Sequence, residues 1–303
     1  MANLKEVRER IRSVKNTQQI TSAMKMVSAA KLRRAQQAIT DLRPYAEKLD
    51  EMLTNILTNL EGDANTSFNK VRPLTGACQV VVTSNRGLAG AFNTNVIKAA
   101  EATIQQELIG AGRLDIYCIG RKGAEYFRKH YKNKPGVTVN SQYQNLFDDL
   151  EFDATRVVPE LIMHRFSQGL YDRVYVAYAS FKNAAVQFAK SEQFLPVEDK
   201  EVPGAVAGAE VGSNIRADYI FEPGKKELLD YLVPQILETK FQSFLLDTHA
   251  SEHGARMTAM DKATENAQEL LRDLKISYNK ARQEAITSEI LEIVGGAAAL
   301  EDG

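Results

Sequence analysis

The chain has 303 residues, of which 44% are hydrophobic and 25% charged, and its formal net charge is −1. These values are typical of a globular protein and exclude a disordered or collagen-like chain, while the near-neutral charge argues against a general binder of polyanions. Two cysteines are too few for a disulfide scaffold or a structural zinc site of their own. No apolar run is long enough for a transmembrane helix, and we expect a soluble protein of a reducing compartment.

The first predicted element is one very long helix. Residues 2–60 contain no glycine and a single proline, Pro44. Apolar residues recur at alternating spacings of three and four, beginning with Leu4, Val7 and Ile11, which predicts a helix with a coiled-coil stripe. Pro44 lacks a backbone donor and is expected to kink or break this helix.

The stripe changes character between residues 16 and 31. Its positions there hold Gln18, Thr21, Lys25 and Ser28 instead of large apolar side chains. One interpretation is a loosely packed or sliding contact, since the neighbouring methionines adapt to irregular surfaces. The other is a narrow seam whose small residues allow close approach. The sequence leaves both open.

The middle of the chain predicts an α/β domain. Short β-branched runs alternate with helical segments, which is typical of a mostly parallel sheet covered on both faces. Residues 203–214, rich in glycine and alanine, predict a flexible insertion or a loop that faces a partner. The predicted strands are 77–83, 114–119, 137–139 and 173–180, with an antiparallel strand at 186–194, and the predicted helices are 93–109, 122–130 and 155–166.

A second long helix is predicted after Pro223-Gly224. Residues 257–285 hold an unbroken heptad series, and Gly295-Gly296 is expected to stop the helix. Two long helices at opposite ends of one chain most simply pair with each other, with a homodimeric coiled coil as the alternative. The predicted organisation is an α/β fold with a helix at 1–60, a Rossmann-like domain at 76–222 and a helix at 223–300.

No motif predicts an active site, a cofactor or a metal. Gly87 and Gly90 lie between a strand and a helix, where a phosphate could bind, but a tight turn explains them as well. Gly120 and Gly123 allow the same two interpretations. The histidines at 249 and 253 lack the metalloprotease pattern and are predicted to be solvated, and both cysteines fall in strands, where packing is expected.

Charge is distributed unevenly along the two helices. There is no acidic residue between Glu9 and Asp41, whereas the stretch after Arg282 has acidic residues and no basic ones. A basic stretch on a long helix predicts an acidic partner surface. A solvated face and a nucleic-acid stripe are the alternatives, although no aromatic residue is interleaved there for base stacking.

Both ends of the chain resemble a known family. The segment TQQITSAMKMVSAAK at 17–31 and the segment ITSEILEIVGGA at 286–297 are similar to the terminal signatures of γ subunits of F-type ATP synthases. Arg86-Gly87-Leu88 supports the resemblance, which covers the whole chain. Gly254 departs from the family, which more often has a helix former there, and glycine costs about 1 kcal/mol in a helix.

The resemblance implies a non-catalytic rotor stalk without cofactors. Its terminal helices would form an antiparallel coiled coil, which couples ion-driven rotation of the membrane c-ring to changes at the β-subunit catalytic sites. Implied partners are the α and β subunits, the ε subunit and the c-ring, at the cytoplasmic face of a bacterial inner membrane. A nucleotide-binding α/β enzyme and a coiled-coil scaffold or nucleic-acid-binding protein are the alternatives. The residues expected to contact the α/β ring are Met24, Lys25, Arg33, Arg34, Arg282, Gln283, Thr287, Glu289 and Glu292.

Overall fold

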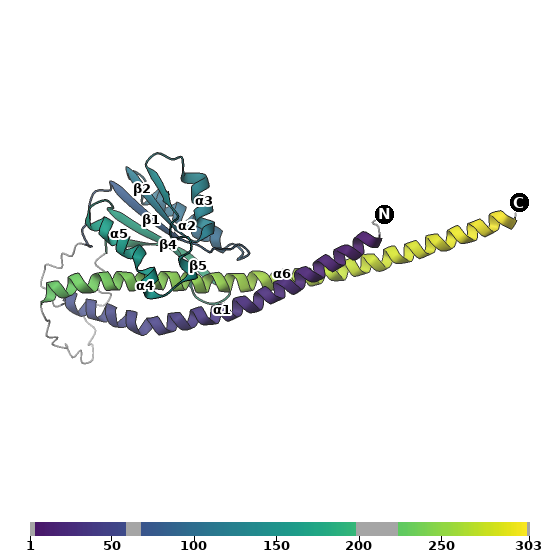
Figure 1. The fold of residues 1–303 in the computed structure, drawn as a ribbon, viewed down its shortest axis with the longest axis horizontal. Helices are drawn as coiled ribbons and strands as arrows, with labels where there is room; N and C mark the ends of the chain where they lie inside the picture. Colours follow the sequence, from purple (N-terminus) through teal and green to yellow (C-terminus); the bar gives the residue numbers. More distant parts are fainter. Residues whose placement is uncertain (1–3, 59–67, 198–223, 302–303) are drawn as a thin grey trace, which may run out of the picture. The chain divides into compact units, whose positions relative to one another are not determined.

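The computed structural model describes residues 4–58, 68–197 and 224–301 (Figure 1). The predicted loop at 203–214 and most of the one at 61–75 lie outside these residues. Two compact units are formed, Met1–Ala30 with Arg256–Gly303 (the helix-pair unit) and Lys31–Ala255 (the sheet unit). The elements are α1 (Leu4–Thr58), β1 (Gly76–Val82), α2 (Phe92–Gln106), β2 (Arg113–Ile119), α3 (Arg121–Tyr131), β3 (Val137–Asn140), η1 (Leu146–Asp148), α4 (Phe152–Thr155), α5 (Val157–Ser167), β4 (Arg173–Phe181), β5 (Gln187–Leu195) and α6 (Lys225–Glu301).

A five-stranded sheet with the order β3-β2-β1-β4-β5 forms the centre of the sheet unit. β1 pairs in parallel with β2 and β4, and β2 pairs in parallel with β3. β5 runs antiparallel to β4, as predicted for residues 186–194. Every residue of β1 is buried, because helices cover both faces of the sheet. The α/β prediction is confirmed.

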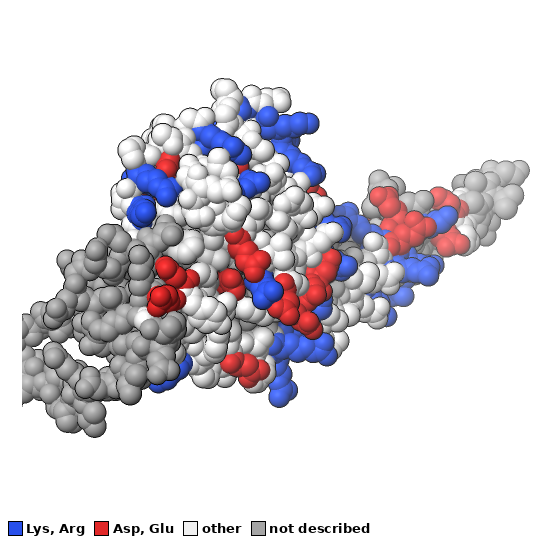
Figure 2. Space-filling model, turned by 60° about the vertical axis from the view of Figure 1, so that its left-hand side comes forward, with Lys and Arg blue, Asp and Glu red and all other residues white. Residues whose placement is uncertain are grey.

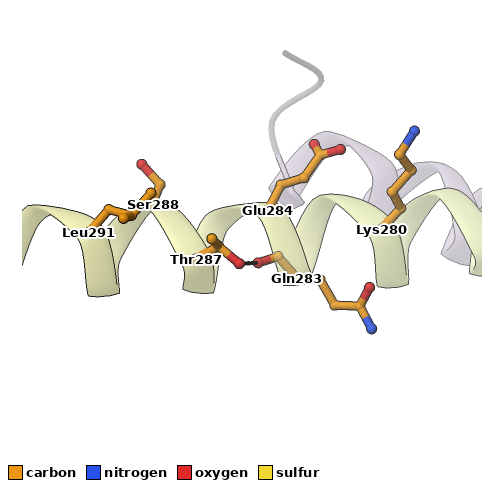
Figure 3. A pocket seen from close by; sticks show the side chains of 6 residues that line it. All are labelled: Lys280, Gln283, Glu284, Thr287, Ser288 and Leu291. Atoms are coloured by element: carbon orange, nitrogen blue, oxygen red, sulfur yellow. Dashed lines mark hydrogen bonds between the residues drawn. The ribbon is translucent and has the colours of Figure 1, made fainter.

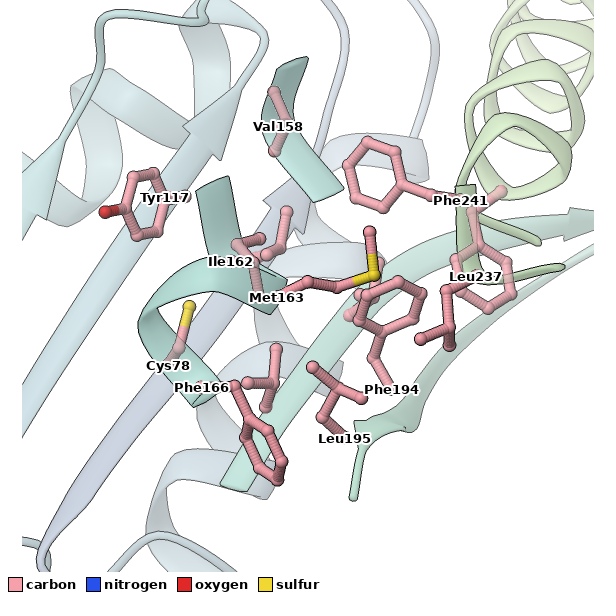
Figure 4. Packing of buried hydrophobic residues seen from close by; sticks show 14 of the residues in the cluster. Cys78, Tyr117, Val158, Ile162, Met163, Phe166, Phe194, Leu195, Leu237 and Phe241 are labelled. Carbon is pink, nitrogen blue, oxygen red and sulfur yellow. The ribbon is translucent and has the colours of Figure 1, made fainter. Parts of the chain in front are cut away.

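Each face of the sheet has its own core. One core packs α2 and α3 against the sheet. The other packs α5 and the first part of α6 against it, with Phe166, Phe194 and Phe241 almost fully buried (Figure 4). Leu49 of α1 joins this second core. The α6 segment before Ala255 is therefore part of a sheet core.

Three contacts join α1 to α6 in the helix-pair unit. Arg8 donates a hydrogen bond to the Tyr278 hydroxyl at 2.8 Å, the hydroxyls of Thr21 and Thr264 lie 2.8 Å apart, and the Lys25 ammonium lies 2.5 Å from the Asp261 carboxylate. Position along α6 falls as position along α1 rises, so the helices are antiparallel. Pairing within one chain is confirmed, and the homodimeric alternative is not needed.

Neither long helix breaks where a break was predicted, so the predicted stop at Gly295-Gly296 and a break at Pro44 are wrong, while a kink at Pro44 stays a prediction. α1 continues through Pro44, whose side chain is exposed, and Ala35 and Leu49 on either side of it are buried. α6 continues through Gly295-Gly296 to Glu301. Glycine keeps its backbone donor and costs a helix only about 1 kcal/mol, and the alanines that follow are the strongest helix formers.

Gly254 has a packing role in the sheet unit. A Cβ atom at this position would lie 3.2 Å from both the Cα atom and the carbonyl oxygen of Ala184, in the turn between β4 and β5. Glycine therefore lets α6 approach that turn closely. This contact explains why a helix former is absent here, which the sequence alone did not show.

Candidate functional site

The glycine turn after β1 is closed by its own side chains. The Ser84 amide donates to Asn93 Oδ1 at 2.9 Å, and the Ser84 hydroxyl donates to the Arg86 carbonyl at 2.6 Å. Leu88 and Gly90 have φ angles of 64° and 58°, which tighten the turn. This geometry favours the tight-turn interpretation of Gly87 and Gly90.

At the start of α3, backbone amides are likewise hydrogen-bonded to groups of the same chain. The amide of Arg121 donates to Asn85 Oδ1 at 3.2 Å, and the amide of Gly123 donates to Thr83 Oγ1 at 2.8 Å. A Cβ atom at Gly120 would lie 2.0 Å from the Thr83 carbonyl oxygen. The amides that a phosphate would need are therefore occupied by the end of β1. Gly90 serves a tight turn, whereas Gly120 and Gly123 allow close packing against Thr83, and both roles disfavour the nucleotide-binding alternative.

The two histidines of α6 are not solvated, so that prediction is wrong. His253 is buried, its Nε2 atom lies 3.1 Å from Nε2 of His249, and the His249 ring stacks on Phe147. η1 covers this part of α6, a tertiary contact that helical spacing does not reveal. Within the described residues, no group of three His, Cys, Asp or Glu side chains could hold a metal ion.

Both cysteines are buried in strands, as predicted. Burial raises the pKa of the Cys118 thiol to about 12, although Arg128 acts to lower it. Burial also raises the pKa of Cys78 well above its ordinary value. Neither residue carries the thiolate that redox or nucleophilic chemistry needs.

A buried polar cluster around Asp115 was not predicted from the sequence. Asp115, on β2, accepts a hydrogen bond from the Tyr171 hydroxyl at 2.6 Å and from Arg113 at 2.8 Å. Arg165 donates to the Tyr171 hydroxyl at 2.9 Å. These groups satisfy one another inside the sheet unit, so the cluster stabilises the fold and offers no open site.

Along the described part of α6, an unbroken exposed stretch runs from Arg282 to Gly295, named here the exposed end. Every side chain in it is exposed. Arg8 faces Tyr278, so Leu4, where α1 begins, faces Arg282, and no described residue of α1 lies opposite the rest (Figure 1). The exposed large apolar residues are Ile286, Ile290, Leu291, Ile293 and Val294, at 49–66% exposure.

A close view shows that the exposed end has no enclosed cavity. Lys280, Gln283, Glu284, Thr287, Ser288 and Leu291 line a shallow hollow, and all six extend from α6 alone (Figure 3). The only hydrogen bond drawn among them runs from the Thr287 hydroxyl to the Gln283 carbonyl, at 2.9 Å. The exposed end therefore offers no pocket for a small ligand. Its exposed apolar side chains, between Ile286 and Val294, are typical of a surface that another protein covers.

The structure separates the predicted contact residues into three sets. Met24 and Lys25 lie half-buried on α1, and Lys25 already pairs with Asp261. Arg33 and Arg34 are exposed on α1 but belong to the sheet unit. The remaining five, all on the exposed end, are Arg282, Gln283, Thr287, Glu289 and Glu292.

The surface carries both signs of charge. Figure 2 shows Lys and Arg interspersed with Asp and Glu on the visible face. Among the described helices, none combines the length and apolar character required to span a membrane.

The described residues define a protein with a pair of long antiparallel helices and an α/β sheet unit, in which one helix end carries a run of exposed apolar side chains. Residues 3–300 match the model of the family described as ATP synthase. The chain is 52% identical over 305 residues to the ATP synthase gamma chain of Cytophaga hutchinsonii, covering 100% of both. It is 46% identical to that of Chlorobium phaeobacteroides, covering 99% of both. The chain belongs to the ATP synthase gamma-chain family.

Solved structures show the same fold. A chain of the Euglena gracilis mitochondrial ATP synthase aligns with a TM-score of 0.62 at 20% identity, covering 99% of this chain and 95% of that one. A chain in the central stalk and c-ring structure of the Tetrahymena thermophila enzyme aligns with a TM-score of 0.54 at 20% identity, covering 80% and 99%. Gamma chains are stalk subunits of a complex that as a whole synthesises ATP.

Proposed function

We propose that the helix pair transmits rotation within the ATP synthase, and that α and β subunits enclose the exposed end of α6. The ε subunit and the membrane c-ring are the other proposed partners. The complex would lie at the cytoplasmic face of the inner membrane. The observation that carries this proposal is the run of exposed side chains from Arg282 to Gly295.

Physical chemistry favours an enclosing partner. Covering apolar surface contributes roughly 25 cal/mol per Å², and a single helix without tertiary contacts is marginally stable in water. Ile286, Ile290 and Ile293 recur at spacings of four and three, so they present one apolar strip to a surrounding wall. Glu289 and Glu292 would require basic or hydrogen-bonding groups in that wall.

The α1 helix adds a second apolar surface to the helix-pair unit. Ile20, Met26 and Val27 are 57–65% exposed. With Met24 beside them, they are suited to an apolar contact. The exposed guanidinium groups of Arg33 and Arg34, in the sheet unit, are suited to acidic loops.

The relatives support the partner assignment. The related Tetrahymena chain belongs to a central stalk with a c-ring, and a related Euglena chain belongs to a rotor. Together with the exposed end of α6, they make the same role the best-supported one for this chain.

Site-specific crosslinking tests the proposal. A photo-crosslinking residue at Ile290 in the reconstituted complex is expected to join this chain to α or β. The same residue at Lys98, exposed on α2 of the sheet unit, serves as the control and should give at most a minor product with α or β. Absence of α or β products from position 290, with the complex intact, would contradict the enclosure.

A further inference from the structure

A layer of polar side chains joins α1 to α6 where polar residues replace the apolar stripe of α1. It consists of Thr21 and Lys25 on α1 and of Asp261 and Thr264 on α6. Thr21 is 8% exposed, and its hydroxyl lies 2.8 Å from that of Thr264. Each threonine hydroxyl also lies within hydrogen-bond distance of a carbonyl of its own helix, Gln18 or Met260, so these polar groups are satisfied.

The neighbouring seam positions are small and closely packed. Ser28 is only 3% exposed, and its hydroxyl donates to the Met24 carbonyl at 2.8 Å. This favours the narrow-seam interpretation over a loose or sliding contact. A polar pair at such a seam fixes how two helices face each other, because only one arrangement satisfies its groups.

We infer that Lys25 is a positioning residue that acts through Asp261 and does not itself contact an acidic partner. Its ammonium lies 2.5 Å from the Asp261 carboxylate, and the two side chains are 42% and 45% exposed. Asp261 belongs to the same chain and is held in place by α6. A partner's carboxylate would have to compete with this pre-positioned group, which has a high effective concentration.

The consequence of this pair is a fixed rotation of α1 about its own axis. Thr21 and Lys25 are four residues apart and face α6, whereas Ile20 and Val27 are seven apart and face outward with 59% and 57% exposure. Holding the first pair against α6 keeps the second pair on the opposite side. Lys25 thus keeps the apolar surface of α1 turned away from α6 and toward the proposed enclosing subunits.

A charge swap distinguishes positioning through Asp261 from direct contact between Lys25 and an acidic partner. The variants are K25D, D261K and the double variant K25D/D261K, with K262D as the matched control on an exposed neighbour. The readouts are ATP synthesis by the reconstituted complex and amide exchange of residues 17–28 in the same complex. We expect each single variant to accelerate this exchange about tenfold and to lower synthesis, while the swap restores both to within about twofold.

Direct contact with an acidic partner gives a different result. The swap would then remain as defective as K25D in synthesis, since an aspartate at position 25 would still repel the partner, and this would overturn the inference. Unchanged exchange in both single variants would also overturn it. The inference uses the proposed function only for the synthesis readout. If exchange follows the swap but Ile290 gives no crosslink to α or β in the intact complex, the positioning role stands and the proposed enclosure fails.

Discussion

The two halves of α6 use the same residue types in opposite ways. In the sheet unit, Phe241, Leu245 and Ala250 have no exposed surface. In the helix-pair unit, Ile290 and Ile293 are 54% and 66% exposed. Both halves are helical and rich in apolar residues, so helix formation and hydrophobicity do not decide burial. The first half therefore stabilises the chain, while the second is available to a partner.

Truncation of apolar side chains should show this difference most strongly. Phe241→Ala removes a fully buried ring from the sheet core and should lower the free energy of unfolding by about 3–5 kcal/mol. Ile290→Ala, on the exposed end, should change it by less than about 0.5 kcal/mol. Urea denaturation of the isolated chain measures both values. Equal losses for the two variants would mean that the exposed end is buried in solution.

Glycine substitutions give a matched pair along the same helix. Gly254→Ala gains about 1 kcal/mol of helix propensity but forces α6 away from Ala184, so we expect a net loss of about 1 kcal/mol. Gly295→Ala meets nothing within 4 Å and should raise local helicity without destabilising the chain. Thermal unfolding and circular dichroism compare the variants. A stabilising Gly254→Ala would contradict the close packing.

The pH dependence of stability should be set in the sheet unit. Burial raises the pKa of Asp247 to about 6, although Lys190 and Arg43 act to lower it. The folded state then binds this proton more tightly than the unfolded chain, so the free energy of unfolding falls as pH rises from about 4 to 6 and the penalty persists above pH 6. Asp247→Asn should therefore stabilise the chain by about 1 kcal/mol at pH 8, allowing for partial solvent screening, and change little at pH 4.

Asp172 provides the control of opposite sign. Burial acts to raise its pKa, but hydrogen bonds from Thr75 and Gly76, the shortest of them 2.6 Å, lower it overall. Its ionised form is therefore favoured in the folded state, and the stability it contributes is lost as pH falls below about 4. Asp172→Asn should destabilise the chain at pH 8. Urea denaturation at pH 4, 6 and 8 should show the two asparagine variants diverging with pH.

The smallest expected effect lies in the helix-pair unit. Tyr278→Phe removes the hydroxyl that accepts a hydrogen bond from Arg8. Arg8 is exposed and Tyr278 is half-buried. Exposed contacts of this kind contribute little, so the free energy of unfolding should change by less than about 0.5 kcal/mol. Chemical denaturation checks this value. A loss above about 1 kcal/mol would mean that this end of the pair is coupled to the sheet core.

Periodicity predicted the elements that have regular patterns. The five strands, including the antiparallel β5, follow from alternation and from β-branched runs. Both long helices follow from spacings of three and four. The features that periodicity did not predict depend on tertiary contacts. The burial of His253 depends on packing outside its own helix, and the need for Gly254 depends on the approach of Ala184.

The candidate site was predicted less completely than the fold. The resemblance placed Thr287, Glu289 and Glu292 on one helical end, and the structure shows that they are exposed there. It did not show that Asp261 pairs with Lys25, because a charged pair across two helices has no signature in either helix alone. Whether the nine predicted residues contact the α/β ring stays a prediction.

Amide hydrogen exchange along α6, measured in the free chain and in the assembled ATP synthase, shows whether partner subunits enclose the exposed end. Residues 241–250 should exchange slowly in both states, since the sheet core protects them. Residues 282–295 should exchange rapidly in the free chain and at least about tenfold more slowly in the complex. Equal exchange of residues 282–295 in the two states would contradict the claim that partner subunits enclose this end of the helix.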